Sequence, residues 1–557
     1  MRFWQFTYPP SALLITILVM GITYARYVTN PIVFDDHNFF SNLSVFSFAE
    51  NPFSPFTRTL PYFSIGLLHV LSMGDLSWNR WFNIALFALT ITALYYFLVR
   101  SVARLFTPST ADLRWAALST SLWFALNPVA VYAVGYLIQR SILMATLFSI
   151  VAANLYLRAQ QQNRNVDILS ASLFGSLSMM SKEHAVLLPI AIIALTPLVQ
   201  DWNRKIAWRA IAFVLILAPV CYWTISHRGD IVGTSYEIYS GEVLSQFPPP
   251  LLFDFPGGAW AMSIATQLGL FLKYAFVWLA PSPSFLSADL RINFASYWQD
   301  VWGVTGCLAT VSLAISALAI SFKKNASPIA KTLAATFLYA AVLYSVELTV
   351  VRVQEPFVLY RSFLWAPAYA LLFCCFLLWY SRHLQKYTRN IQRAFYVAIP
   401  LACLCLIPWT LERLQSFSSE EALWRDALQK LPSASTAGAD RIYYNLAGEA
   451  YKAKRYTEAL QFSNRVISQN PHAFQGYLAK GTSMLALADT DGASRAFDEA
   501  STHPSPPEFR GYIEFKRCIV LQVRGETTAL PECLKRSAGL GYQPAAILLQ
   551  MMELHPG

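Results

Sequence analysis

Long runs of apolar residues, separated by short polar connections, occupy most of the first 410 residues of the chain. A helix that crosses a bilayer needs about 20 mostly apolar residues. The pattern therefore predicts an all-α, polytopic membrane domain with about eleven transmembrane helices, although one run, 168–181, is short for a span. The predicted spans are residues 11–27, 79–99, 115–133, 137–157, 168–181, 184–200, 210–226, 300–321, 332–351, 362–381 and 394–410.

A further apolar run, residues 262–281, is ambiguous. It contains Gln267 and Lys273, and these polar residues favour a re-entrant or interfacial helix. A true span here would move all later connections to the other side of the membrane, unless another span were lost. The sequence leaves this point open, and the count of eleven excludes the run.

Lysine and arginine cluster in five of the connections. Short cytoplasmic loops are enriched in these residues. With a cytoplasmic N-terminus and eleven spans, all five clusters fall on the cytoplasmic side, which is the topology we predict. The clusters are Arg100, Arg104 and Arg114; Arg158 and Arg164; Arg204, Lys205 and Arg209; Lys323, Lys324 and Lys331; and Arg382, Lys386, Arg389 and Arg393.

A second set of polar and charged residues falls at the opposite, outer face in this topology. A charge at the bilayer centre costs roughly 2.5–3.5 kcal/mol on insertion scales. Several such residues on otherwise apolar segments, gathered at one face, therefore indicate a shared polar cavity. They are Asp35, Asp36, Arg58, Gln139, Arg140, Lys182, Glu183, Asp289, Glu355 and Arg361.

Composition supports a membrane protein and excludes other classes. The chain is 55% hydrophobic and only 13% charged, whereas soluble domains carry about 25% charged residues. The net charge of +10 does not indicate nucleic-acid binding, because the basic residues are confined to loops between apolar runs. The first run lacks a small-residue cleavage site, so it is interpreted as a signal anchor rather than a cleaved signal peptide. No cysteine or histidine spacing indicates a metal site.

The composition changes abruptly after Trp409, and we divide the chain into a membrane domain (1–410) and a C-terminal domain (411–557). In the latter, small residues recur at a period typical of paired-helix tetratricopeptide repeats. This predicts an α-solenoid of tetratricopeptide type, which either binds a protein or peptide on its concave face or caps the membrane cavity. The pairs 34 residues apart are Ala447 and Gly481, Ala459 and Ala493, and Val466 and Ala500.

Two cysteines lie in this polar domain, Cys518 and Cys533. Their spacing would allow a disulfide between two packed helices if the domain faced an oxidising compartment. The sequence leaves open whether they are bonded. The other six cysteines lie in apolar runs, where a thiol is most simply a small hydrophobic group.

Six short segments carry the acidic and basic residues of the outer face in a fixed order. They are "FDDHNF" at Asp35 and Asp36, "FTRTLPYFS" at Arg58, "LNPVAVYAVGYLIQRS" at Arg140, "SMMSKEHAVLLP" at Lys182 and Glu183, "APSPSFLSADLR" at Asp289, and "VQEPFVLYRSFLW" at Glu355 and Arg361. With the spans and the C-terminal repeats, these segments resemble the GT-C superfamily of polyprenyl-phosphate-sugar-dependent glycosyltransferases. The resemblance is greatest to the transmembrane and tetratricopeptide-repeat O-mannosyltransferases and their bacterial relatives. The chain departs from that pattern at Thr59 (usually Pro), at Asn127 (usually His) and in a longer spacing between Glu355 and Arg361.

The resemblance implies a role for each residue. Asp35 would be the catalytic base and Asp36 its partner, since a carboxylate in a partly desolvated cleft gains a raised pKa. Basic side chains would hold the donor phosphate through charge-assisted hydrogen bonds, and the remaining charged residues would support these or bind substrate. The phosphate-binding set is Arg140, Lys182 and Arg361, and the supporting set is Arg58, Glu183, Asp289 and Glu355.

Each residue also has a simpler interpretation. The Asp35–Asp36 pair could make ordinary loop hydrogen bonds, and Arg140 and Arg361 could extend to the membrane interface. Glu355 could be a structural partner of Arg361, and His184 is interpreted as local packing.

From the resemblance we predict an integral membrane glycosyltransferase. It would transfer a sugar from a polyprenyl monophosphate to a hydroxyl of an acceptor, with a protein favoured, at the outer face of a bacterial inner membrane. The C-terminal domain would be periplasmic and would bind the acceptor protein through its repeats. No cofactor is required by this interpretation. Related lipid-monophosphate-sugar transferases generally act without a metal, whereas pyrophosphate-sugar oligosaccharyltransferases need one, so the metal dependence stays open with the class of donor.

Two alternatives stay open. One is an O-antigen polymerase or ligase, against which the Asp35–Asp36 pair argues. The other is a non-catalytic membrane scaffold that presents the repeats, which leaves the charges of the outer face unexplained.

Overall fold

The computed structural model describes residues 11–41, 44–52, 57–106, 109–227, 235–237, 240–247, 258–294, 301–323 and 325–554. The chain is 79% helical, and the described residues contain two isolated β-bridges but no strand. The all-α prediction is confirmed. The chain divides into two compact units, which we call the membrane unit (residues 1–240, 250–290 and 294–423) and the C-terminal unit (241–249, 291–293 and 424–557).

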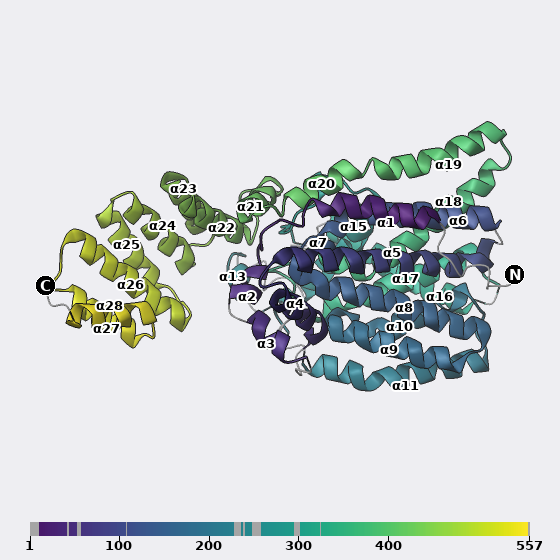
Figure 1. Cartoon of the computed structure of the whole chain (residues 1–557), viewed down its shortest axis with the longest axis horizontal. Helices are drawn as coiled ribbons and strands as arrows, with labels where there is room; N and C mark the ends of the chain where they lie inside the picture. Colours follow the sequence, from purple (N-terminus) through teal and green to yellow (C-terminus); the bar gives the residue numbers. More distant parts are fainter. Residues whose placement is uncertain are drawn as a thin grey trace. The chain divides into compact units, whose positions relative to one another are not determined.

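Long helices form the bulk of the membrane unit, joined by short helices and turns (Figure 1). The long ones are α5 (Leu76–Phe106), α6 (Thr110–Ala125), α8 (Arg140–Gln162), α9 (Asn165–Ser181), α11 (Arg204–Ser226), α15 (Gly258–Leu279), α16 (Val301–Phe322), α17 (Pro328–Tyr344), α18 (Ala366–Leu384) and α19 (Arg389–Leu404). The shorter ones include α1 (Ser11–Ala25), α2 (Asp36–Ser41), α3 (Ser44–Glu50), α4 (Thr59–Leu71), α7 (Val131–Val134), α10 (Leu188–Ala194), α20 (Ile407–Gln415) and the 3-10 helices η3 (Leu137–Gln139), η4 (Glu183–Leu187), η5 (Thr196–Leu198), η7 (Ser345–Thr349) and η8 (Leu359–Leu364).

Seven helical segments of the described chain are long and apolar enough to cross a membrane, and a pair bent by 51° (Ala111–Ala125 with Pro128–Val134) would make an eighth. These segments indicate a multi-pass membrane protein. They are Leu76–Arg104, Leu137–Gln162, Arg204–Ser226, Gly258–Leu279, Gly303–Phe322, Pro328–Thr349 and Arg389–Gln415.

The prediction of eleven spans is therefore supported only in part. Helix α1 has 15 residues and α9 has 17, which is short for a bilayer crossing. The predicted span 184–200 is broken into η4, α10 and η5, with prolines at Pro189 and Pro197 in the first turns of the last two. Proline lacks the N–H that continues a helix, which explains the breaks.

The ambiguous run forms one continuous helix, α15, of 22 residues, and it is among the seven span candidates. Gln267 does not face lipid: it is 1% exposed, and its Nε2 donates to the Pro356 carbonyl at 2.7 Å. Nearer the C-terminal end of α15, Tyr274 Oη donates to Val358 O and Trp278 Nε1 donates to Ser362 Oγ. Gln267 is thus satisfied by protein and does not argue against a span, whereas Lys273 is exposed, with its Nζ 4.8 Å from the centroid of the Phe357 ring.

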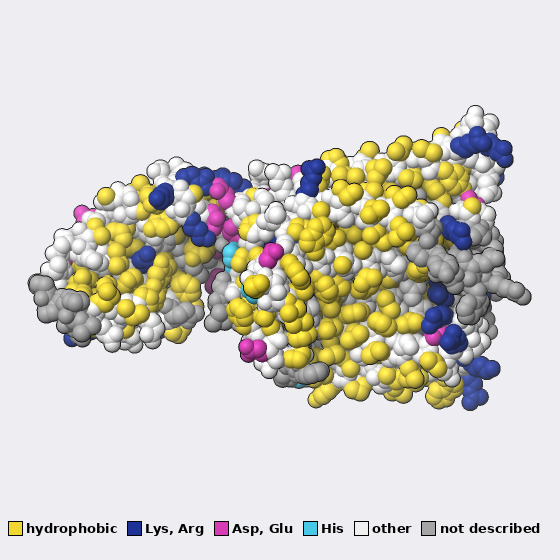
Figure 2. All heavy atoms as spheres, in the orientation of Figure 1, with side chains coloured by type: hydrophobic (Ala, Val, Ile, Leu, Met, Phe, Trp, Pro, Cys, Tyr) yellow, Lys and Arg dark blue, Asp and Glu magenta, His cyan; other side chains and the backbone are white. Residues whose placement is uncertain are grey.

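The basic connections lie together at one end of the membrane unit. Asp201 accepts from Arg104 at 3.2 Å and from Lys331 at 2.7 Å, and Arg209 donates to Asn163 and Asn165. Figure 2 shows Lys and Arg side chains gathered at this end of the helices. Lys324 lies outside the described residues. The side of the membrane that this end faces stays a prediction.

The C-terminal unit is a succession of helices in which each packs on the next. The spacing found in the sequence corresponds to helix starts, because α23 and α25 begin 34 residues apart, and Gly481 lies where a Cβ would come within 2.6 Å of the Phe497 ring. The helices are α22 (Ala439–Lys452), α23 (Tyr456–Gln469), α24 (Phe474–Ala486), α25 (Thr490–Thr502), α26 (Pro507–Arg524), α27 (Leu530–Gly539) and α28 (Gln543–Leu554), preceded by α21 (Glu420–Gln429), which begins in the membrane unit.

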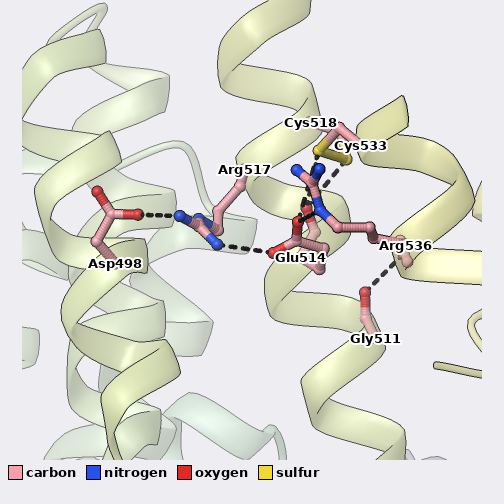
Figure 3. Close-up of a disulfide and its surroundings, with 8 residues drawn as sticks. Asp498, Gly511, Glu514, Arg517, Cys518, Cys533 and Arg536 are labelled. Atoms are coloured by element: carbon pink, nitrogen blue, oxygen red, sulfur yellow. Dashed lines mark hydrogen bonds and ion pairs between the residues drawn. A yellow bond between two sulfur atoms is a disulfide. The ribbon is translucent and has the colours of Figure 1, made fainter. Parts of the chain in front are cut away.

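Cys518 of α26 and Cys533 of α27 form a disulfide (Figure 3), which answers the question that the sequence left open. Beside it, the Glu514 carboxylate accepts from Arg517 at 2.8 Å and from Arg536 at 2.9 Å. Arg517 also pairs with Asp498 of α25 at 2.7 Å. The disulfide and this cluster, which we call the Glu514 cluster, fasten three consecutive helices together.

Candidate active site

A chain of alternating positive and negative side chains lies buried in the membrane unit. The Arg58 Nε and Nη2 atoms donate to both oxygens of Glu183, at 2.8 and 2.5 Å. His184 lies between two carboxylates, with Nδ1 3.0 Å from Glu183 Oε1 and Nε2 3.0 Å from Glu347 Oε1. Arg361 Nη1 donates to Glu347 Oε2 at 3.0 Å. These five side chains, which we call the ionic chain, are at most 13% exposed.

The far end of the ionic chain contacts a third buried glutamate, Glu237. Its Oε1 accepts from Arg352 at 3.2 Å, and Arg352 Nε lies 3.1 Å from Glu347. Arg361 Nη2 in turn donates to Glu355 at 3.1 Å. Glu237 Oε2 accepts from three successive backbone amides, those of Val353, Gln354 and Glu355. The segment from Arg352 to Arg361 is therefore folded around charged groups.

The candidate site residues lie at the ends of helices, where the backbone leaves regular α-helical geometry. Lys182 caps the end of α9 in an extended conformation, and Glu183 opens the 3-10 helix η4. Arg58 precedes α4 with φ 71°, and Phe34, just before Asp35, has φ 56°. Left-handed backbone at non-glycine residues costs of order 1–3 kcal/mol and persists only where the surroundings impose it. Two such residues beside candidate site residues therefore point to a site whose geometry is imposed by its surroundings.

Lys182 is the one member of the phosphate-binding set whose charge has no hydrogen-bonded or ion-paired partner among the described residues. It is 2% exposed, and its Nζ lies 5.5 Å from the centroid of the Tyr360 ring. Burial lowers the pKa of Lys182 to about 7, and the charges of Arg58 and Arg361 act in the same direction while Glu183 opposes them. A buried ammonium of this kind gains stability from an added anion.

The two aspartates differ in environment. Asp36 is 1% exposed, and its carboxylate accepts from the amides of Ile138 (2.9 Å) and Val33 (3.4 Å). Burial raises the pKa of Asp36 to about 7, against the opposing effect of the Ile138 hydrogen bond and of Arg80. Asp35 is only partly buried. Asp36 thus fastens the loop, and Asp35 is the more accessible carboxylate.

Two tyrosines connect the acidic loop with the ionic chain. The amide of Asp35 donates to the hydroxyl of Tyr136 at 2.9 Å, and the Tyr136 ring lies 6.3 Å from that of Tyr360 in an edge-to-face arrangement. Burial raises the pKa of both phenols, and the charge of Asp35 contributes to both. Asp35 and Lys182 therefore lie on two neighbouring rings, Asp35 at Tyr136 through its amide and Lys182 over Tyr360.

Arg140 has a separate environment. It is fully buried, and its guanidinium donates to Asn83 Oδ1, to Ser64 Oγ and to both oxygens of Asn79, at 2.7–3.1 Å. Every nitrogen already donates to a neutral oxygen, and the recorded contacts do not bring Arg140 to Lys182 or Arg361. A phosphate-binding role for Arg140 stays a prediction.

Asp289 is buried at 9% exposure. The next residue, Leu290, forms a β-bridge with Phe357, on the segment that carries Glu355 and Arg361. Asn127, at the usual place of the family's histidine, caps η2 (Pro128–Ala130) by accepting from Val129 N, and it donates to Trp278 O at 2.9 Å.

Three residues of the site escaped the sequence analysis: Glu237, Glu347 and Arg352. Glu347 lies inside the predicted span 332–351, and a charge within a span is itself a signal of function that could have identified it. Glu237 and Arg352 lie in polar connections, where a charge is unremarkable. His184, interpreted as packing, is the link between the two halves of the ionic chain.

A cavity adjoins Glu183 and His184. It is small, with a volume of about 30 Å³, and it is partly open to the exterior. Apart from these two residues, its walls are aliphatic or threonine side chains of η4, α11 and η7 with Val350: Val186, Thr224, Ile225, Val346, Thr349 and Val350. An apolar space thus reaches the charged site from the side of α11, a helix that is mostly exposed.

The described residues contain no group of three or more His, Cys, Asp or Glu side chains placed to hold a metal ion. No protein-family model, no curated protein and no solved structure matches the chain. The functional assignment therefore depends on the motifs and on the geometry of the site.

Proposed function

We propose that the protein is an integral membrane glycosyltransferase of the GT-C type, which transfers a sugar from a polyprenyl monophosphate to a hydroxyl of an acceptor protein. The observation that carries the proposal is that Asp35 and Lys182 lie on two adjacent tyrosine rings: the Asp35 amide contacts the Tyr136 hydroxyl, and Lys182 lies over the neighbouring Tyr360 ring. A partly buried carboxylate and a buried ammonium without a partner among the described residues are the two groups that this transfer requires: a base for the hydroxyl and a cation for the phosphate.

The phosphate would bind at Lys182. Leaving His184 aside and counting Lys182 as charged, four cations (Arg58, Lys182, Arg352 and Arg361) face four carboxylates (Glu183, Glu237, Glu347 and Glu355) in this region. The arginines are already paired, so Lys182 is the group with charge to offer. A donor phosphodiester brings one negative charge, and binding it would favour protonated Lys182.

The transfer step balances with these groups. The acceptor oxygen attacks the anomeric carbon, the bond from that carbon to the phosphate oxygen breaks, and its electron pair leaves on the phosphate. The hydroxyl proton passes to Asp35. The phosphate gains a second negative charge, which Lys182, with Arg58 and Arg361 beside it, is placed to stabilise. Asp36 holds the loop and takes no proton from substrate.

The cavity beside Glu183 and His184 joins an apolar wall to charged groups, the combination that a lipid-linked phosphate needs, and at about 30 Å³ it would have to widen to admit a polyprenyl chain. A polyprenyl chain is apolar and its phosphate is charged, so a binding site must bring an apolar space to a charged one. The aliphatic side chains of α11 and η7 form the apolar wall, and the ionic chain provides the charged groups.

Location and partners complete the proposal. The disulfide supports an oxidising compartment for the C-terminal unit, and the gathered basic connections support a cytoplasmic opposite end. We place the protein in a bacterial inner membrane with the site facing the periplasm. The helix spacing of 34 residues supports a tetratricopeptide solenoid that binds the acceptor protein, and no cofactor is needed for the transfer step.

The test is an intact-mass comparison of exported proteins from cells with the gene, without it, and with single variants. Asp35→Asn should abolish a sugar-sized mass difference that the wild type produces. The matched control is Asp75→Asn, an exposed aspartate of the same unit, which should leave the modification unchanged. Normal modification by Asp35→Asn, at equal protein levels, would sink the proposal; the absence of any mass difference with the wild type would redirect it to a glycolipid acceptor or a scaffold.

A further inference from the structure

The carboxylate of Glu237 lies inside a group of converging hydrogen-bond donors. Its Oε2 atom accepts from the backbone amides of Val353, Gln354 and Glu355, at 3.0, 2.8 and 3.2 Å. Its Oε1 atom accepts from Arg352 Nη1 at 3.2 Å. Successive backbone amides that converge on one point form a concave site for anions. The three amides and the Arg352 guanidinium, which we call the amide cradle, therefore have the form of an oxyanion site that a side chain of the same chain fills.

The Glu237 carboxylate does not use all the donors around it. Arg352 is 3% exposed, and its Nη2 atom has no hydrogen-bond partner in the described part of the chain. Arg361 is also buried, and its Nη2 atom lies 3.9 Å from Glu237 Oε1, which is beyond hydrogen-bond distance. A buried donor that is left unused costs free energy. A ligand with more acceptor oxygens than a carboxylate would use donors that Glu237 leaves unused.

A phosphate group has these properties. Free phosphate and phosphate monoesters present more terminal oxygens than a carboxylate, converging backbone amides bind phosphate, and arginine binds it through two parallel hydrogen bonds. We propose that the amide cradle is a phosphate-binding site, that the Glu237 carboxylate occupies it in the resting protein, and that a bound phosphate group takes the place of this carboxylate. Lys182, the group proposed above for the donor phosphodiester, is not one of the donors of the cradle.

The exchange requires only the side chain of Glu237 to move. The backbone of its segment is held separately, because the Val351 amide donates to the Ser235 carbonyl at 2.9 Å and Tyr236 forms a β-bridge with Val351. The carboxylate and a phosphate group compete for the same donors. The apparent affinity for phosphate is therefore reduced by the fraction of molecules in which the cradle is vacant, and removal of the carboxylate should raise it.

Two sources would supply the phosphate group, namely free phosphate and a lipid monophosphate. The second is the product that remains when a sugar leaves a polyprenyl monophosphate, so this source alone rests on the proposed function. The site itself rests on the contacts of Glu237 and Arg352.

The experiment follows the thermal unfolding midpoint of the purified full chain in detergent while inorganic phosphate replaces chloride at constant ionic strength. Glu237→Ala should unfold at a lower temperature than the wild type, and phosphate should restore its midpoint with an apparent affinity about tenfold higher, or more. Adding Arg352→Gln to Glu237→Ala should weaken this restoration. The matched control is Glu242→Ala, an exposed glutamate of the same connection, which should respond to phosphate as the wild type does. Both comparisons are repeated with Lys182→Met added, so that the donor site does not contribute.

No restoration of Glu237→Ala by phosphate, or equal responses of Glu237→Ala and Glu242→Ala, overturns the inference, because Glu237 then only fastens the backbone of residues 353–355. If Glu237→Ala does not accumulate, Glu237→Asp decides. Its shorter side chain fills the cradle only in part, so a response to phosphate no larger than that of the wild type contradicts a phosphate site.

Farnesyl phosphate, with farnesol as its control, identifies the source. Binding to Glu237→Ala about tenfold tighter than inorganic phosphate assigns the cradle to a lipid monophosphate, and equal or weaker binding assigns it to free phosphate. Sugar transfer is scored separately. Loss of transfer by Asp35→Asn without restoration of Glu237→Ala would reject only the phosphate site, whereas restoration together with normal transfer by Asp35→Asn would reject only the proposed function.

Discussion

Both units of the protein contain a buried glutamate held between two arginines, and the two differ in what surrounds them. In the Glu514 cluster the arginines Arg517 and Arg536 are 41% and 55% exposed. In the membrane unit, Arg352 and Arg361 on either side of Glu347 are 3% and 7% exposed. The exposed pair lies beside a disulfide, and the buried pair lies beside Lys182. The same arrangement thus stabilises helix packing in the C-terminal unit, where water reaches the arginines. In the membrane unit it forms part of the candidate site, where the buried cation Lys182 has no hydrogen-bonded or ion-paired partner among the described residues.

The largest expected effect is a difference in stability loss between variants of the buried Glu347 and of Glu514, whose arginines are partly exposed. Glu347→Gln should destabilise the membrane unit by about 3–5 kcal/mol, because it leaves buried arginines with one carboxylate fewer. Glu514→Gln should cost about 1 kcal/mol or less, since water screens its partly exposed arginines. Denaturant unfolding of each purified variant measures this, and equal losses would contradict the distinction.

The second effect concerns Asp36 and pH. The pKa of Asp36 is raised from 3.8 in the unfolded chain to about 7 in the folded one, so the folded state favours the protonated group. Its stabilising contribution is complete below pH 3.8 and is lost as the pH rises through 7, up to about 4 kcal/mol. Relative to Asp36→Asn, the wild type should therefore lose stability between pH 4 and 7 and no further above it. A difference that does not vary with pH would contradict this.

The third effect should stay within the C-terminal unit. Replacing Cys518 and Cys533 together by serine removes a cross-link between residues 15 apart, which constrains the unfolded chain by about 3 kcal/mol. Protease digestion should show easier opening of α26 and α27. Helices of the membrane unit should remain as resistant as in the wild type, and their loosening would argue that the two units do not unfold separately.

The smallest expected effect is on the activation free energy of transfer. It distinguishes Lys182 from Lys516, two lysines that lie over tyrosine rings. Lys182→Met should lower the transfer rate about 100-fold without lowering stability, because it removes a buried charge that no described group pairs with. Lys516→Met is the matched control: Lys516 lies 5.2 Å from the Tyr512 ring in the C-terminal unit. It should leave the transfer rate per bound acceptor unchanged. An equal loss of transfer rate in both variants would contradict a specific role of Lys182 in binding the donor phosphate.

Much of the fold could be predicted from the sequence because the helices follow from the local pattern of apolar and polar residues. Apolar runs predicted the long helices, and the recurrence of small residues predicted the paired helices that meet at Gly481 and Phe497. The number of spans was supported only in part: seven or eight described segments are long and apolar enough to cross a membrane, and Pro189 and Pro197 divide one of the predicted spans into short helices. The partner of Gln267 could not be predicted, because the Pro356 carbonyl is 89 residues away in the chain.

The candidate site could be predicted only where a charge stood out from its neighbours. Lys182, Glu183 and Arg361 did so. Glu237 did not, because its role depends on a contact with Arg352 across 115 residues. Arg80 and Arg140 show the opposite case: both are buried arginines of apolar helices, yet only the contacts reveal that one is fully hydrogen-bonded and the other is not.

The ionic chain is also ordered in time. Arg58, Lys182 and Glu183 leave the ribosome more than 160 residues before Glu347 and Arg361, which at 5–20 residues per second corresponds to roughly 8–30 s. Throughout this interval Arg58 and Glu183 can already form their ion pair. Glu347 is synthesised later, shortly before Arg352 and Arg361, the arginines with which it pairs. Arg58 and Glu183 can thus enter the membrane as a neutral pair, and His184 joins this pair to Glu347 while about 200 residues of the chain are still to be synthesised.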